Sequence, residues 1–217
     1  MIEVRGHDEP NLPKVRMKIL LLSDLHSSQE ALANIDKLMA LEHFHIVLCT
    51  GDMTNHQDPR GVEYLEHFIE LVKTKHNTEL KLVFGNNDDD PVIAYARIRR
   101  VLLHFECMNI SGERICGIGD FESHPDSHTY QMPDVAGSIL MTHRPPLKQL
   151  VKSKELSLIK GSPTFHLAGH LHSRAETWQL GATTVIQIPA ALDGRYATLE
   201  LPSNKIQFKW FKESSAS

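Results

Sequence analysis

The sequence predicts an α/β fold made of two packed sheets. Apolar runs and amphipathic helical segments alternate over the first hundred residues, as in chains that join parallel strands through crossover helices. After about Val101 the pattern changes, and short apolar stretches follow one another between turn-rich segments. This second half indicates a second, mixed sheet that packs on the first.

The first half predicts three strand–helix units. Residues 18–23, 45–49 and 80–84 are short apolar runs, as expected of parallel strands covered on both faces. Helix signals follow each strand: a serine cap at Ser27 or Ser28, then Asp58-Pro59 and Asp90-Pro91, each an N-cap with proline at the first helical position.

The second half predicts one helix and several short strands. The helix covers about 147–159, and the strands cover 114–118, 138–141, 164–168, 175–180, 183–188, 196–201 and 205–211. Residues 119–134 form the longest irregular stretch, which suggests a functional loop or lid. We divide the chain into an N-terminal extension (1–16), one domain (17–212) and a frayed tail (213–217).

Composition narrows the functional classes. The formal net charge of −4 shows no basic bias, which argues weakly against a nuclease. Three cysteines, Cys49, Cys107 and Cys116, fit neither a zinc knuckle nor a disulfide framework. Cys49 lies in an apolar run and is expected to pack as a small hydrophobe. A reducing cytoplasm is the simplest compartment for such a chain.

No membrane or secretory signal is expected. Residues 1–16 carry acidic side chains and lack a continuous apolar core, unlike a signal peptide. The run 19–22 is far too short to span a bilayer. We therefore expect a cytoplasmic protein without a membrane partner.

Polar side chains with metal-binding chemistry follow the predicted strands. Taken alone, most of these elements are ordinary turns or capped strand ends, and only Gly-His-x-His is suggestive, because residues i and i+2 of an extended chain project to the same side. Together they converge, because the carboxyl ends of parallel strands share one sheet edge. The side chains are Asp24, His26, Asp52, Asn86, His143, His170 and His172.

The donor types favour particular ions. Carboxylate, imidazole and amide oxygen without thiolate suit Mn²⁺, Fe or Zn²⁺. Seven such ligands can gather around two metal ions, and two ions suit hydrolysis of a phosphoester because they neutralise the phosphoryl oxygens. The pattern therefore predicts a metal-dependent phosphoester hydrolase.

Five ordered blocks resemble the calcineurin-like metallophosphoesterase superfamily over about residues 17 to 189. The resemblance implies a four-layer α/β/β/α sandwich of two mixed sheets flanked by helices, with two divalent metal ions, Mn²⁺ preferred, between the sheets. It implies Asp24, His26 and His172 at the first metal, Asn86, His143 and His170 at the second, and Asp52 as the bridge that positions an attacking hydroxide. The blocks are Asp24-Leu25-His26, Gly51-Asp52, Gly85-Asn86-Asn87-Asp88, His143 and Gly169-His170-Leu171-His172.

Asn87 departs from the family pattern. Members commonly carry histidine here, which contacts the phosphoryl group and protonates the leaving group. Asparagine can donate a hydrogen bond but cannot protonate a leaving group. Without a replacement for this general acid, the hydrolysis rate is expected to fall by roughly 10²–10⁴-fold. Three interpretations remain open: a substrate with a good leaving group, another proton donor, or a binding module. Candidate donors are His56, His124 and His128.

Arginines complete the candidate site. Arg144 and Arg174 each follow a histidine block and can fork onto phosphate oxygens. Arg97, Arg99 and Arg100 form a small basic run, which is usually a solvated helix face.

We predict a phosphodiesterase acting on a small-molecule phosphoester, with Asn87, Asp52, His124 and Arg144 as catalytic candidates. A nuclease and a non-catalytic protein-binding scaffold are the alternatives, although retention of all seven ligands speaks against the scaffold. Nucleic acid is not excluded but not indicated, since the aromatic fraction is 6% without aromatic–basic interleaving. The sequence does not predict the oligomeric state.

Overall fold

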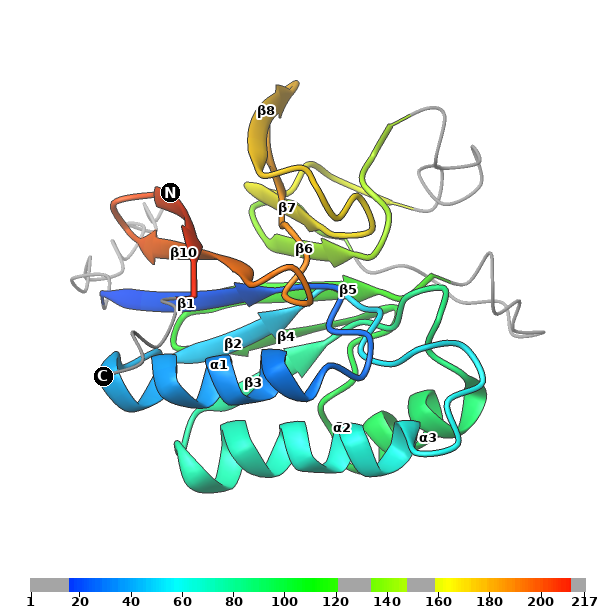
Figure 1. Ribbon diagram of the computed structural model, residues 1–217. Helices are drawn as coiled ribbons and strands as arrows, with labels where there is room; N and C mark the ends of the chain where they lie inside the picture. Colours follow the sequence, from blue (N-terminus) through cyan, green and yellow to red (C-terminus); the bar gives the residue numbers. More distant parts are fainter. Residues whose placement is uncertain (1–15, 121–133, 148–158, 212–217) are drawn as a thin grey trace, which may run out of the picture.

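The computed structural model describes residues 16–120, 134–147 and 159–211. Two mixed sheets of five and six strands pack on one another, and helices cover the outer face of the first (Figure 1). This confirms the predicted α/β fold with two mixed sheets.

The five-stranded sheet, here sheet A, has the order β11-β10-β1-β2-β3. Its parallel centre consists of β1 (Met17–Leu22), β2 (Ile46–Cys49) and β3 (Glu79–Leu82). β10 (Arg195–Leu201) pairs antiparallel with β1, and β11 (Lys205–Trp210) pairs with β10. The assignment of these last strands to the second sheet was therefore wrong. β10, buried at five of its seven residues, pairs instead with the edge of β1 that β2 leaves open.

Three helices lie along sheet A. α1 (Gln29–Leu41) starts at Ser28, whose hydroxyl accepts the Ala31 N–H, as predicted. α2 (Gly61–Ile69), extended by a π-helical segment (Glu70–Lys75), starts later than predicted, because the Asp58 carboxylate binds Ser27 and the Arg60 N–H in a turn instead of capping the helix. α3 (Asp90–Ile98) starts within one residue of the prediction. None of the helices in the described ranges has both the length and the apolar composition that crossing a membrane requires.

The six-stranded sheet, sheet B, has the order β4-β5-β6-β7-β9-β8. Its four central strands are parallel, whereas the edge strands β4 and β8 are antiparallel to their neighbours. The predicted helix at 147–159 and the irregular stretch at 119–134 lie mostly outside the described residues. The strand bounds are Glu106–Ile110, Glu113–Ile118, Ile139–Thr142, Phe165–Ala168, Glu176–Leu180 and Thr183–Gln187 for β4 to β9.

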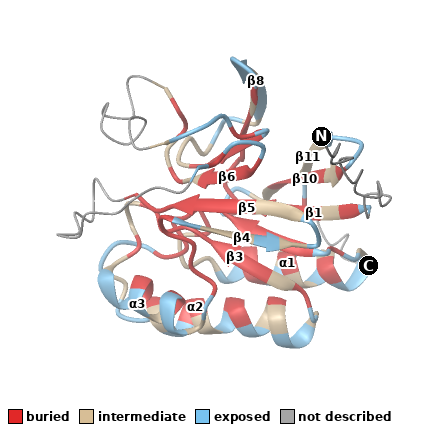
Figure 2. Cartoon of the chain, turned by 180° about the vertical axis from the view of Figure 1, so that it is seen from behind, coloured by how far each residue is buried: buried red, intermediate tan, exposed pale blue. Residues whose placement is uncertain are grey.

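Both faces of β1 are buried. Leu20 and Leu22 pack with the helices, whereas Ile19 and Leu21 pack with residues of sheet B. The red core in Figure 2 follows these two interfaces. Because successive side chains of a strand point to opposite faces, β1 packs with the helices on one face and with sheet B on the other.

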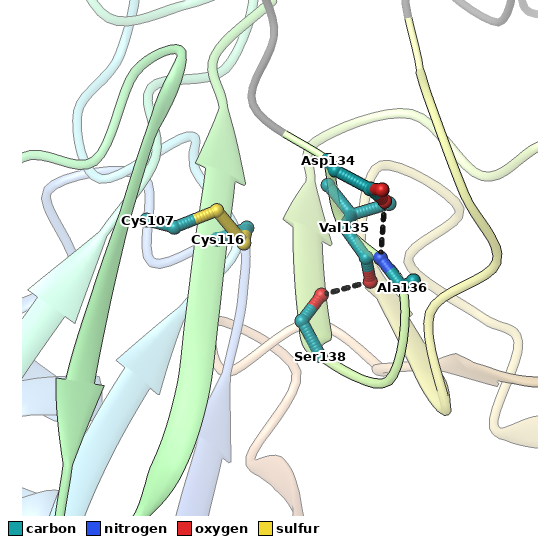
Figure 3. Close-up of a disulfide and its surroundings, with 6 residues drawn as sticks. All are labelled: Cys107, Cys116, Asp134, Val135, Ala136 and Ser138. Carbon is teal, nitrogen blue, oxygen red and sulfur yellow. Dashed lines mark hydrogen bonds between the residues drawn. A yellow bond between two sulfur atoms is a disulfide. The ribbon is translucent and has the colours of Figure 1, made fainter. Parts of the chain in front are cut away.

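Cys107 and Cys116 form a disulfide between β4 and β5 (Figure 3). The expectation of no disulfide was therefore wrong. The antiparallel register places the two residues directly opposite one another, which spacing along the sequence does not reveal. Cysteine composition no longer favours a reducing compartment. Cys49 is free and buried in β2, as predicted.

Buried His166 in β7 makes stability depend on pH. Burial lowers its pKa to about 4, and its Nε2 lies 2.8 Å from the Thr142 hydroxyl oxygen. The native state keeps this imidazole neutral, while the unfolded chain takes up a proton below about pH 6.5. Stability is therefore fully present above pH 6.5 and declines as the pH falls towards 4.

We expect the metal-free wild-type protein to lose about 3 kcal/mol more unfolding free energy between pH 7 and pH 4 than His166→Gln does. Urea denaturation in EDTA at several pH values measures the difference. Parallel pH curves for the two proteins would contradict the assignment.

Candidate metal centre

The seven candidate ligands come together where the strands of the two sheets end. Asp24 and His26 follow β1, Asp52 follows β2, and Asn86 follows β3. His143 follows β6, and the pair His170 and His172 follows β7. The predicted convergence is therefore present, although the convergence alone does not establish a role for each side chain.

Asp24, His26 and His172 form one group that can hold a metal ion. The Nε2 atoms of His26 and His172 are 3.2 Å apart. Oδ1 of Asp24 lies 3.3 Å from Nε2 of His172 and 3.9 Å from Nε2 of His26. This oxygen is buried and has no hydrogen-bond partner, so it offers a free lone pair to the group.

Asp52, His143 and His170 form a second group, with Asn86 beside it. Nε2 of His143 lies 3.4 Å from Oδ2 of Asp52 and 3.2 Å from Nδ1 of His170. Oδ1 of Asn86 is 3.1 Å from the same nitrogen. The Nδ1 atom of His143 is 2.9 Å from the Thr50 carbonyl oxygen, so Nδ1 carries a hydrogen, and in the neutral form of the ring Nε2 has the lone pair that can bind a metal ion.

Asp52 links the two groups. Its Oδ2 lies 3.7 Å from Nε2 of His26 and 3.4 Å from Nε2 of His143. The carboxylate is 2% exposed and sits between one imidazole of each group. One side chain can thus contact ions in both positions.

The backbone at these positions adopts an unusual conformation. Asp24, His26, Asp52 and His170 have φ values of 53°, 47°, 50° and 67°, a left-handed region that costs non-glycine residues free energy. Main-chain hydrogen bonds join the loop after β1 to the loop after β2. The Asp24 N–H donates to the Gly51 carbonyl oxygen, and the His26 N–H donates to the Asp52 carbonyl oxygen. Such strain concentrates at functional sites.

Close approach between loops requires glycine at 51 and 85. Gly51 has φ +98°, and a Cβ there would lie 2.6 Å from the Gly85 nitrogen. A Cβ on Gly85 would in turn collide with the Asp52 carboxylate. The two Gly positions of the sequence blocks therefore let the second and third loops touch.

Charges within the site shift the pKa values of Asp52 and His143 in opposite directions. Burial opposes ionisation of Asp52, but the hydrogen bonds and charge of His143 and hydrogen bonds from Asn87 hold its pKa well below the usual range. Burial also opposes protonation of His143, yet Asp52 raises its pKa to about 9. The pair is therefore ionised near neutral pH when no metal is bound.

The pKa values of the flanking histidines also shift. Burial, followed by His143 and Arg144, lowers the pKa of His170. The nearby carboxylate of Asp24 raises the pKa of His172 against the effect of burial.

Asn87 contacts Asp52 rather than open space. Its backbone N–H donates to Oδ1 of Asp52 at 2.8 Å, and its side-chain nitrogen donates to Oδ2 at 2.7 Å. Both carboxylate oxygens are therefore oriented by one residue. This contact engages one of the two N–H groups of the Asn87 amide.

Asp88 joins two loops of the site through hydrogen bonds. Its buried carboxylate accepts the Gly85 N–H, the Thr54 N–H and the Thr54 hydroxyl at 2.9, 2.9 and 3.1 Å. Burial and the nearby Asp52 raise its pKa to about 7. Asp88 thus connects the loop after β3 with the loop after β2.

Arg144 lies at the edge of the second group. Its Nε donates to Oδ2 of Asp120 at 2.8 Å, and its Nη1 lies 3.5 Å from Nε2 of His170. Arg174 instead faces solvent beside Glu176. His56 is exposed and pairs with Asp89, and His124 and His128 lie outside the described residues.

Sequence reasoning missed four supporting residues. Ser23 donates to Oδ2 of Asp24, Thr50 accepts from His143, Asp120 binds Arg144, and Gln187 donates to the Gly169 carbonyl. Ser23 and Thr50 directly follow β1 and β2, so their position next to the loops was the available signal. Gln187 and Asp120 gave no comparable signal.

A sequence model of the calcineurin-like phosphoesterase superfamily domain matches residues 17–189. No curated protein sequence matches the chain. Several solved structures share its fold. A protein of Thermus thermophilus is 15% identical, with 91% of this chain and 100% of that one covered and a TM-score of 0.65.

Two further structural neighbours are described as enzymes. A dimetal phosphatase of Danio rerio is 10% identical, with 90% and 99% covered and a TM-score of 0.60. An archaeal phosphodiesterase is 13% identical, with 89% and 99% covered and a TM-score of 0.55. At these identities the likeness concerns the fold.

We expect Asp88→Ala to lower the free energy of unfolding by about 2–4 kcal/mol, because three buried donors lose their acceptor. The control is Asp89→Ala, whose carboxylate makes only partly exposed contacts and should cost less than about 1 kcal/mol. Urea denaturation in EDTA measures both. Equal costs would refute a bracing role for Asp88.

Proposed function

The chain belongs to the calcineurin-like phosphoesterase superfamily, and from this premise we propose that it hydrolyses phosphoesters with two divalent metal ions. The preferred substrate is a small phosphodiester or an activated phosphoester. The observation that supports this most is the pair of ligand groups that meet at Asp52.

The spacing of the imidazole nitrogens fits ions in both groups. Two nitrogens bound to one ion at about 2.1 Å lie about 3.0–3.4 Å apart in octahedral or tetrahedral geometry. The separations of 3.2 Å in the His26–His172 pair and 3.2 Å in the His143–His170 pair match this value.

The free oxygen of Asp24 gives a second reason. A buried carboxylate oxygen without a donor is costly, and a cation is the partner that its surroundings lack. Asp24, His26 and His172 would hold one ion, and Asn86, His143 and His170 the other, with Asp52 shared. Mn²⁺ is preferred for this donor set, with Fe or Zn²⁺ as alternatives.

The protein residues prepare the site for an in-line displacement. When bound, the two ions supply Lewis acidity towards the phosphoryl oxygens and lower the pKa of water at the site. Asn87 fixes the angle of the Asp52 carboxylate, and the Thr50 carbonyl fixes the His143 ring. The Arg144 guanidinium, which binds Asp120 and lies beside His170, would contact a phosphoryl oxygen bound next to His170.

A proton donor for the leaving group is the weak part of the site. Asn87 has no titratable proton, and in the described part of the chain no histidine other than the candidate ligands contacts Asp52. We therefore favour substrates whose leaving group departs without protonation. This reasoning supports a phosphodiester or an activated ester over an alkyl monoester.

Metal content tests the assignment of ligands. We expect about two equivalents of Mn²⁺ per chain after loading, and loss of both bound ions and turnover in Asp52→Ala. Asn87→Ala should keep the ions while turnover on bis(p-nitrophenyl) phosphate falls by roughly 10–100-fold, because Asn87 acts through Asp52. Elemental analysis and initial rates provide the two readouts.

A wild-type chain that takes up no metal and hydrolyses nothing would favour the scaffold. Salt-sensitive binding and cleavage of nucleic acid would favour the nuclease. Loss of both ions from Asn87→Ala would contradict the role given to Asn87.

Sensitivity to the leaving group tests the chemistry. Because general-acid help is worth roughly 10²–10⁴-fold, we expect a nitrophenyl ester to react faster than the matching alkyl ester by at least that factor. Initial rates on a series of aryl and alkyl methylphosphonates or phosphodiesters give the dependence on leaving-group pKa. A flat dependence, with the chemical step shown to limit the rate, would reveal an unidentified proton donor.

A further inference from the structure

A second pocket opens between α3, β3 and β4, and none of the seven candidate ligands lines it. Its volume is about 570 Å³, within the range of small-molecule sites. Figure 2 shows α3, β3 and β4 from this side, with exposed residues on β4. The lining residues used below are Lys81, Arg97, Arg100, Leu102, Leu103 and Met108.

The charge of the lining is predominantly positive. Lys81, Arg97 and Arg100 face one acidic lining residue, Glu106. Lys81 is nearly buried, and its Nζ donates to the Arg100 carbonyl oxygen at 2.8 Å and pairs with Glu79 at 3.1 Å. Lys81 thus supports the backbone of Arg100 while its charge is partly compensated.

The two arginines of the pocket lack such partners. Within the described ranges, neither the Arg97 nor the Arg100 guanidinium makes a hydrogen bond or an ion pair. The intervening Arg99 behaves differently, because its Nη1 donates to the Tyr95 hydroxyl at 2.6 Å and lies 3.6 Å from Glu66. Arg99 therefore has a structural role at the end of α3, whereas Arg97 and Arg100 are available to an anion.

The backbone of Arg100 adds an independent observation. Its φ is +58°, at the position after a helix end where glycine is the usual residue. An arginine at this position costs free energy that glycine avoids, so a glycine there would remove the cation and relieve the backbone. Arg100 is exposed to solvent at the rim of the pocket.

The floor of the pocket is apolar. Leu102 and Leu103 are 8% and 3% exposed, and Met108 on β4 is partly buried. A simple inorganic anion would leave this surface in contact with water. A ligand with an anionic head and an apolar or aromatic body would contact both parts.

We propose that this pocket binds a small organic phosphate, of the nucleoside phosphate class, through Arg97 and Arg100. The guanidinium groups hold the phosphate, and Leu102, Leu103 and Met108 contact the body of the ligand. The site needs no metal ion. It is therefore separate from the proposed catalytic centre, and it stands even if the proposed function fails.

The test uses calorimetric titration of the whole protein with α,β-methylene-ADP, a hydrolysis-resistant probe. Titrations are run on metal-loaded protein and on protein kept in EDTA, since chelation removes binding that depends on metal ions, and the arginine variants then assign the remaining binding to the pocket. The variants are Arg97→Gln, Arg100→Gly and their combination. Arg100→Gly removes the cation and relieves the left-handed backbone, so its folding is not at risk. Arg99→Gln on the same helix is the matched control.

We expect binding in EDTA that weakens at least tenfold in the double variant and stays unchanged in Arg99→Gln. Inorganic phosphate should bind at least tenfold more weakly than the nucleotide. Turnover of bis(p-nitrophenyl) phosphate should be the same in all arginine variants without nucleotide. The proposal is overturned if nothing binds in EDTA, if Arg99→Gln weakens binding as much as the double variant, or if phosphate binds as tightly as the probe.

Discussion

Three carboxylates buried at one end of sheet A are the constraint on which the rest of the site depends. Asp24, Asp52 and Asp88 are 0%, 2% and 1% exposed. Each would cost several kcal/mol if left without compensation. The loops supply N–H donors to all three, from His170 to Asp24, from Asn87 to Asp52 and from Gly85 to Asp88. The same bonds tie loops from both sheets together, so the demand of the charges for partners also orders the site.

The conformation of the loops follows from this demand. A residue that follows a strand can direct its side chain back over the sheet edge only if its backbone departs from the extended conformation. Asp24 and Asp52 do so with positive φ, and aspartate tolerates that region better than most residues. Glycine at 51 and 85 then allows the backbones to touch. The left-handed backbone, the contact between the loops and the buried carboxylates therefore depend on one another.

The part of this arrangement that the sequence could predict is the part governed by strand periodicity. Parallel apolar runs place Asp24, Asp52 and Asn86 at one edge whatever the remaining contacts are. Contacts across the fold were not predictable in this way. The Cys107–Cys116 bond depends on the register of a hairpin, and β10 joins β1 although the two strands lie near opposite ends of the described chain. The turn at Asp58 depends on Ser27, so a local capping signal gave the wrong helix start.

Asn87 shows how one substitution changes several functions of a position. An imidazole there would add a donor and, when protonated, a positive charge beside Asp52. The amide adds donors without charge, and the backbone and side-chain nitrogens of Asn87 both bind Asp52 in the structure. The negative charge of Asp52 is balanced by protonated His143 when no metal is bound, so the ionisation of this carboxylate depends on its histidine neighbour. Under the proposed function, the phosphoryl group would be stabilised by cations, Arg144 included, and a leaving group that departs without protonation would suit the described part of the site.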